Sequence, residues 1–302
     1  IVCATCAVGL FRNHKTLQQS ETTTETIDDS PRPTWSDRAT WFGLAMVASV
    51  MLLATTNQVC LDVATVPFLW ILPLTLYLAS FILCFDGDRW YSRRWYVAGL
   101  ILALLGVTKT LLSGATVSIV LQVFVYLAAL FACCMVCHGE LSRQKPGPRY
   151  LTSFYLLMSA GGAGGGLFVG LLAPTIFPAY WELHIGIVAC LIATLVIFFR
   201  DRNSYLYRGQ PRPAWVLIVL WVGLLSWSLQ GHARDAVRSA LDVSRNFYGV
   251  LRVEDDPDTN TRKLFHGSIQ HGTQFLDEAR RATPTTYYGV KSGAGLVMQY
   301  HK

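Results

Sequence analysis

Seven long apolar runs limit this chain to a small set of possible folds. Each is close to the roughly 20 residues that an α-helix needs to cross the hydrocarbon core of a bilayer. The apolar letters are continuous rather than alternating, and hydrophobic residues make up 52% of the 302 residues, against 15% for charged residues. This combination is typical of a polytopic membrane protein. The runs are 39–56, 66–85, 95–112, 115–137, 150–173, 181–199 and 214–229.

Lysine and arginine alternate between the loops that join these runs. Four loops carry three or four of them each, and the loops between carry none. The basic loops are 12–38, 86–94, 139–149 and 200–213, and the uncharged ones are 57–65, 113–114 and 174–180. By the positive-inside rule the basic loops face the cytoplasm, which predicts an outer location for everything after residue 230. Because the basic residues are dispersed among loops, the net charge of +6 does not indicate nucleic-acid binding.

The composition divides the chain into four parts. Residues 1–11 are typical of the last turns of a partial transmembrane helix, 12–38 of a polar loop, and 39–230 of a transmembrane helical domain. Residues 231–302 predict a small β-sheet domain.

In that last part, strand-forming residues at 247–254 and 261–266 flank the turn-rich stretch DDPDTN. We expect the sheet to continue through 270–275 and 295–300. The predicted fold is therefore an α-helical bundle of about seven spans, followed by a small antiparallel β-sheet. We also expect further sequence on both sides of this chain, which would make it a fragment of a multi-pass protein of a bacterial inner or plasma membrane.

The end of the fourth run spells Cys-x-x-Cys-His at 134–138, the signature of covalent haem attachment. Haem is attached outside the cytoplasmic membrane, whereas the charge pattern puts His138 at a cytoplasmic helix end, so we disfavour haem. A zinc site of Cys134, Cys137, His138 and Glu140 is an alternative, although closed zinc sites usually take ligands from a second segment. The favoured interpretation has no metal: His138 and Glu140 reach the membrane interface, and the cysteines are buried apolar residues.

A glycine-rich stretch, GGAGGGLFVG, occupies 161–170 within the fifth run. Gly162, Gly166 and Gly170 recur every four residues, which predicts a smooth helix face for close packing against another helix. A dinucleotide-binding loop is disfavoured because Leu167 stands where the last glycine of that motif belongs and no strand precedes it.

Four segments together resemble one known family. They are CHGELSRQKPGPRYLTSFYLLMSAGGAGGGLFVGLLAPTIFPAYWE (137–182), RNFYGVLRV (245–253), LFHGSIQHGTQ (264–274) and PTTYYGVKSGAG (284–295). The set resembles the membrane-anchored spermidine-synthase-like proteins, in which a polytopic helical region precedes an aminopropyltransferase-like domain. The resemblance extends over most of residues 39–300.

The resemblance implies that the parent protein transfers an aminopropyl group from decarboxylated S-adenosylmethionine to a diamine. A Rossmann-like domain after this chain would hold the adenosyl group and the catalytic carboxylate, so the chain has no catalytic residue or cofactor of its own and is not catalytically complete. Its implied partners are the lipid bilayer, a polyamine and that following domain. A transporter, or a membrane binding module for a polyamine or another cation, is the alternative.

The resemblance also implies which residues line the substrate cleft. In the soluble enzymes, a glutamine after an Asp-Gly pair and a more distant tyrosine have this role, and histidine replaces the aspartate here in both candidate pairs. The implied substrate-binding residues are His266, Gln270, His271, Gln274, Tyr287 and Tyr288. Turn and sheet-packing roles for the same residues remain the alternative.

Overall fold

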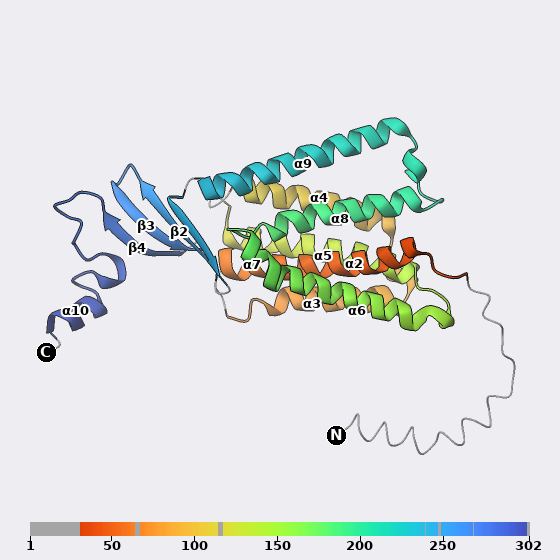
Figure 1. Cartoon of the computed structure of the whole chain (residues 1–302), viewed down its shortest axis with the longest axis horizontal. Helices are drawn as coiled ribbons and strands as arrows, with labels where there is room; N and C mark the ends of the chain where they lie inside the picture. The colour runs from red at the N-terminus through yellow and green to blue at the C-terminus, as the bar shows by residue number, and fades with distance from the viewer. Residues whose placement is uncertain are drawn as a thin grey trace, which may run out of the picture.

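The computed structural model describes residues 31–63, 67–113, 117–238, 240–246, 249–267 and 269–300. The partial helix predicted for 1–11 and most of the predicted polar loop lie outside these residues. Long helices run side by side along the longest dimension of the molecule, and a small sheet extends from one end of them (Figure 1).

Within the described residues, each of the seven predicted runs contains a helix. The bundle contains α2 (Trp35–Asn57), α3 (Ile71–Asp86), α4 (Arg93–Ser113), α5 (Ile119–Arg143), α6 (Leu151–Leu167), α7 (Ala173–Ile176), α8 (Glu182–Arg200) and α9 (Arg212–Arg238). Two π-helical segments extend these helices, η1 (Gln58–Val63) after α2 and η5 (Phe168–Leu172) between α6 and α7. Among the described residues, six continuous helices are long and apolar enough to cross a membrane. The 16-residue helix α3 is shorter, and α9 continues beyond the predicted end of its run.

Helix α2 forms the centre of the bundle. Its buried face, which includes Trp41, Leu44, Ala48 and Met51, packs in one apolar core with residues of α4, α5, α6, α8 and α9. By contrast, α9 presents large apolar side chains outward, including Leu217, Leu220, Leu224 and Trp227. Such an outer surface is compatible with a lipid bilayer and would be unfavourable in water.

Close packing of α6 on α2 depends on two glycines. A Cβ atom on Gly161 would lie 2.3 Å from the carbonyl oxygen of Phe42, and one on Gly165 would lie 2.7 Å from that of Met46. Both distances are far below van der Waals contact, so only glycine fits at these positions. Small residues four apart allow two membrane helices to approach closely, as the sequence predicts for this stretch.

The glycines that contact α2 lie one position before the predicted Gly162 and Gly166. A Cβ atom on Gly162, Gly166 or Gly170 would meet nothing within 4 Å. Successive residues of an α-helix are separated by about 100°, so the face that carries Gly161 and Gly165 points in a clearly different direction. Gly162 does contact α2 through its backbone, since the Ser49 hydroxyl donates to the carbonyl oxygen of Gly162 at 2.9 Å.

The sheet is a four-stranded antiparallel meander in the order β1 (Asp242–Asn246), β2 (Gly249–Asp256), β3 (Thr261–His266) and β4 (Ile269–Phe275). The predicted strands at 261–266 and 270–275 are therefore present, and the one predicted at 247–254 corresponds to β2. The strand predicted at 295–300 is wrong, because these residues lie in the helix α10 (Gly293–Tyr300). Ser292 caps this helix: its hydroxyl oxygen accepts a hydrogen bond from the Gly295 amide at 3.0 Å.

Two ion pairs join β2 to β3, and they make the stability of the sheet depend on pH in the acidic range. Lys263 donates to Asp256 at 2.5 Å, and this hydrogen bond lowers the pKa of Asp256 to about 2. A hydrogen bond from Arg262 also lowers the pKa of Asp255. Because both folded-state pKa values lie below the ordinary value of 3.8, the pairs stabilise the sheet above that pH and lose this effect as the pH falls toward 2.

We therefore expect amide hydrogen exchange in β2 and β3, corrected for the intrinsic rate, to accelerate as the pH falls from about 4 to about 2. Asp256→Asn should weaken this acceleration, because its amide cannot titrate. Asp277→Asn, which alters an exposed pair outside the strands, is the control. An unchanged pH profile for Asp256→Asn would contradict this assignment.

Candidate functional site

Three of the six predicted substrate-binding residues form a continuous group of rings. The ring centroids of His266 and His271 are 5.8 Å apart, and those of His271 and Tyr287 are 6.0 Å apart. His266 ends β3, His271 lies in β4, and Tyr287 lies in the short 3₁₀ helix η7 (Thr286–Tyr288). The histidines are half-buried, and Tyr287 is 55% exposed. We call these three residues the ring group.

A β-bulge brings the two histidines together. Leu264 pairs with Gly272, but the next residue, Phe265, pairs with Gln270, so His271 is the extra residue of β4. A bulge of this kind locally redirects a side chain that strict alternation would fix on one face. Space for His266 comes from Gly249 of β2, where a Cβ atom would lie only 2.2 Å from His266 Nε2.

Hydrogen bonds hold η7 against β4, so the position of Tyr287 is set by the sheet. The Thr286 hydroxyl donates to the carbonyl oxygen of His271 at 3.4 Å, and the Thr285 hydroxyl donates to that of Thr273. Both contacts span more than ten residues of chain. They close the loop that follows β4 back onto the strand.

The other predicted residues do not join the ring group. Gln270 lies opposite Phe265, which places it on the face of the sheet away from His266, and its amide donates to the Thr273 hydroxyl at 2.6 Å. Gln274 lies opposite Arg262, four residues along β3 from His266. Tyr288 follows Tyr287 and is 59% exposed. A substrate-binding role for any of the six remains a prediction.

A buried ion pair that the sequence did not reveal joins the sheet to the bundle. Arg245 of β1 donates to both carboxylate oxygens of Glu182, at 2.7 and 3.1 Å, and to the carbonyl oxygen of Ala179. The side chains of Arg245 and Glu182 are 3% and 0% exposed. Asn57, at the end of α2, donates to the same carboxylate at 3.3 Å. Glu182 is the first residue of α8. From the sequence, this position is expected at the membrane–water interface, where water can solvate the carboxylate.

A cavity of about 110 Å³ adjoins this ion pair. Its walls include Asn57, Tyr180, Arg245 and Gly170, and the Arg245 guanidinium lies 4.8 Å from the centroid of the Tyr180 ring. Because the charges of Arg245 and Glu182 are already paired, the cavity offers no free carboxylate to a cation. The ion pair therefore serves to fix the sheet on the bundle.

A second charged cluster lies at the opposite end of the bundle. Arg93 donates to both carboxylate oxygens of Glu140 at 2.6 Å, and Tyr91 donates to one of them at 2.9 Å. Arg93 also pairs with Asp201, and its hydrogen bond lowers the pKa of that carboxyl group. These contacts tie the start of α4 to the ends of α5 and α8.

Two predictions for the end of α5 were wrong. Glu140 and His138 do not face the membrane interface: they are 2% and 1% exposed and buried within the protein. His138 Nδ1 lies 3.0 Å from the Ser80 hydroxyl, between the rings of Tyr77 and Phe81. The local physical reason is that α5 continues to Arg143, so neither residue is at the helix end.

The residues of the alternative zinc site contact different partners in the structure. Glu140 binds Arg93, His138 contacts Ser80, and Cys137 lies with Cys133 and Cys190. The ligand atoms of Cys134, Cys137, His138 and Glu140 therefore form no common site in the described part of the chain.

Comparison of this chain with protein-family models, with curated proteins and with solved structures found no match.

Proposed function

We propose that this chain is the membrane-anchored, amine-binding part of an aminopropyltransferase-like protein. The observation that carries the proposal is the ring group: residues that the resemblance assigns to a substrate cleft, and that are 21 positions apart from His266 to Tyr287, lie next to one another on the sheet. In this proposal the whole protein uses decarboxylated S-adenosylmethionine as co-substrate, and the present chain supplies membrane attachment and part of the amine site.

The chemistry of the ring group suits a primary amine. A tyrosine ring attracts an alkylammonium ion through its face, and a neutral imidazole nitrogen accepts a hydrogen bond from it. Imidazole is also the side chain that most readily accepts a proton near neutral pH. An amine must lose a proton before it can attack the propyl carbon of the donor, so a site that combines these groups can bind the amine and receive its proton.

A second candidate function follows from where the sheet lies. The sheet extends from the end of the bundle opposite to the helix ends that carry the basic loops (Figure 1). Together with the positive-inside rule, this arrangement favours a position of the ring group outside the cytoplasm, away from an adenosyl donor made inside the cell. An amine-binding module without transferase chemistry is therefore the alternative that this arrangement favours.

Binding of putrescine to the purified chain in lipid nanodiscs tests the proposal. Isothermal titration should show saturable binding, with propylamine binding more weakly because it has only one amino group. The double variant His271→Ala with Tyr287→Ala should weaken putrescine binding by about 3- to 30-fold, the range expected for the loss of a cation–π contact.

Tyr300→Ala is the matched control, because Tyr300 is an exposed aromatic residue of α10 outside the ring group. No saturable binding, or equal binding by the double variant and the wild type, would refute an amine site on the sheet. Product formation from decarboxylated S-adenosylmethionine by the whole protein separates the two candidates: binding without product favours the binding module.

A further inference from the structure

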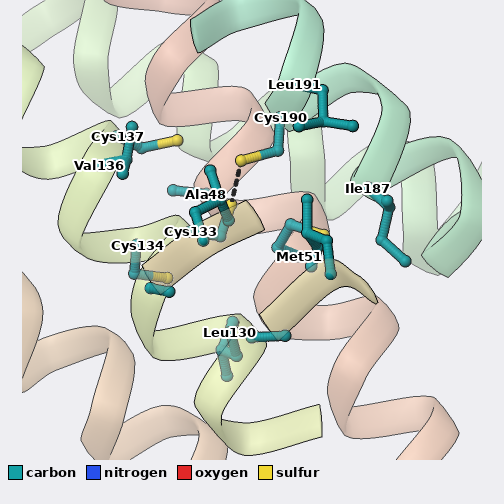
Figure 2. Packing of buried hydrophobic residues seen from close by; sticks show 14 of the residues in the cluster. Ala48, Met51, Leu130, Cys133, Cys134, Val136, Cys137, Ile187, Cys190 and Leu191 are labelled. Carbon is teal, nitrogen blue, oxygen red and sulfur yellow. Dashed lines mark hydrogen bonds between the residues drawn. The ribbon is translucent and has the colours of Figure 1, made fainter. Parts of the chain in front are cut away.

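Three cysteine thiols meet inside the bundle. Cys133 and Cys137 belong to α5 and Cys190 belongs to α8, and their three Sγ atoms all lie within 4.8 Å of one another. The Sγ atoms of Cys133 and Cys190 are 2.8 Å apart, and Figure 2 marks this contact with a dashed line. The residues are 0%, 1% and 0% exposed. We call these three residues the thiol cluster.

The helix geometry explains why these three thiols converge and a fourth does not. Residues four apart on an α-helix share a face, so Cys133 and Cys137 both point toward α8. Cys134 is equally buried, but it is rotated by about 100° from Cys133 and lies outside the cluster. The bundle therefore contains a buried cysteine beside the cluster that can serve as an internal control.

The spacing fits a metal ion bound by sulfur. A bond of about 2.3 Å from a central ion to each of three sulfur atoms places those atoms about 4 Å apart. In the thiol cluster, one Sγ–Sγ distance is 2.8 Å and the other two are within 4.8 Å. Small rotations of the cysteine side chains would bring all three distances to about 4 Å. Three sulfur ligands suit a soft monovalent ion better than Zn²⁺, whose closed structural sites take four ligands.

We propose that the thiol cluster binds one Cu(I) ion. Each ion that binds displaces at least one thiol proton to solvent, and no electron is transferred. When one proton leaves, the complex of one thiolate, two thiols and Cu⁺ carries no net charge. A neutral complex is the form that apolar surroundings such as Ala48, Met51 and Leu191 favour.

This site lies in the bundle and uses none of the sheet residues, so it goes beyond the proposed amine-binding function and does not depend on it. The sequence alone could not show it, because Cys190 is 53 residues from Cys137.

Competition for Cu(I) tests the site. The purified chain, reduced with a phosphine in nanodiscs without oxygen, is titrated against a chromophoric Cu(I) chelator. We expect one Cu(I) per chain and a sulfur-only coordination sphere by X-ray absorption. Cys190→Ser removes a sulfur ligand and should lower the Cu(I) affinity by more than about 100-fold. Mutating residues that only support the ligands of a metal site already lowers metal affinity by about 10- to 100-fold.

Cys134→Ser should retain wild-type affinity, and circular dichroism with size-exclusion chromatography confirms that each variant is folded. Cys137→Ser provides a second ligand variant if Cys190→Ser does not fold, and it should show the same loss. Absence of competition by the wild type, or equal affinity of the ligand variants and Cys134→Ser, would overturn the proposal. A Cys133–Cys190 disulfide that survives the phosphine, seen as a mass lower by two hydrogens, would overturn it as well.

Discussion

Arg245→Ala should release the β-sheet from the helical bundle and lower the free energy of unfolding by about 3–5 kcal/mol. The substitution leaves the Glu182 carboxylate fully buried without its cation, because Asn57 supplies only one hydrogen bond at 3.3 Å. An unpaired buried charge is one of the few single changes that destabilise a protein this strongly. Thermal unfolding in detergent measures the loss, and limited proteolysis between α9 and β1 reports the release.

Arg252→Ala is the matched control for this prediction. Arg252 also lies in the sheet and pairs with a glutamate, but its 3.5 Å contact with Glu254 is about 30% exposed on both sides. Such surface pairs contribute up to about 1 kcal/mol. Replacing Arg245 by Met and Glu182 by Leu together should recover much of the stability lost in Arg245→Ala, since it removes both charges. Equal effects of Arg245→Ala and Arg252→Ala would show that the buried pair does not anchor the sheet.

Gly161→Ala should separate α6 from α2 and destabilise the bundle by about 1–3 kcal/mol. The added Cβ would lie 2.3 Å from the Phe42 carbonyl oxygen, which is backbone within a helix and cannot rotate away. Gly165→Ala should act in the same direction, because its Cβ would lie 2.7 Å from the Met46 carbonyl oxygen. Thermal unfolding in detergent, compared among single-alanine variants, measures the effect.

Gly162→Ala and Gly166→Ala provide the contrast, since nothing lies within 4 Å of a Cβ at either position. Alanine is a better helix former than glycine by up to about 1 kcal/mol, so these variants should be neutral or slightly more stable. If Gly166→Ala destabilises the bundle as much as Gly165→Ala, the assigned face of α6 is incorrect.

The two charged clusters, one buried and one partly exposed, explain how an apolar bundle keeps a defined arrangement. Between helices in lipid, apolar contacts alone select orientation weakly, because lipid chains are as apolar as leucine. Arg93 with Glu140 and Asp201 fixes one end of the bundle, and Arg245 with Glu182 fixes the other end and the sheet. Each pair links residues far apart in sequence. The second of these clusters attaches β1, at the edge of the sheet, to the helical bundle.

Elements that depend on local properties could be predicted from the amino-acid sequence. Each of the seven apolar runs contains a helix, six of them long enough to cross a membrane, and the strand-forming residues on either side of DDPDTN form the β2–β3 hairpin. These predictions succeed because helix length and turn formation depend on neighbouring residues and on the solvent. The strand prediction at 295–300 was wrong for a local reason. Ser292 precedes these residues and caps a helix, and serine at this position is a helix-start signal.

Which helix faces meet became known from the three-dimensional packing. The four-residue glycine spacing is equally consistent with two faces of α6, and contact with α2 selected Gly161 and Gly165. In the same way, the crossing of α5 and α8 joined Cys190 to Cys133 and Cys137, and docking of β1 joined Arg245 to Glu182. The rotation of each helix about its axis depends on all of its packing contacts. These contacts involve residues far apart in the sequence, so no local stretch can predict the rotation.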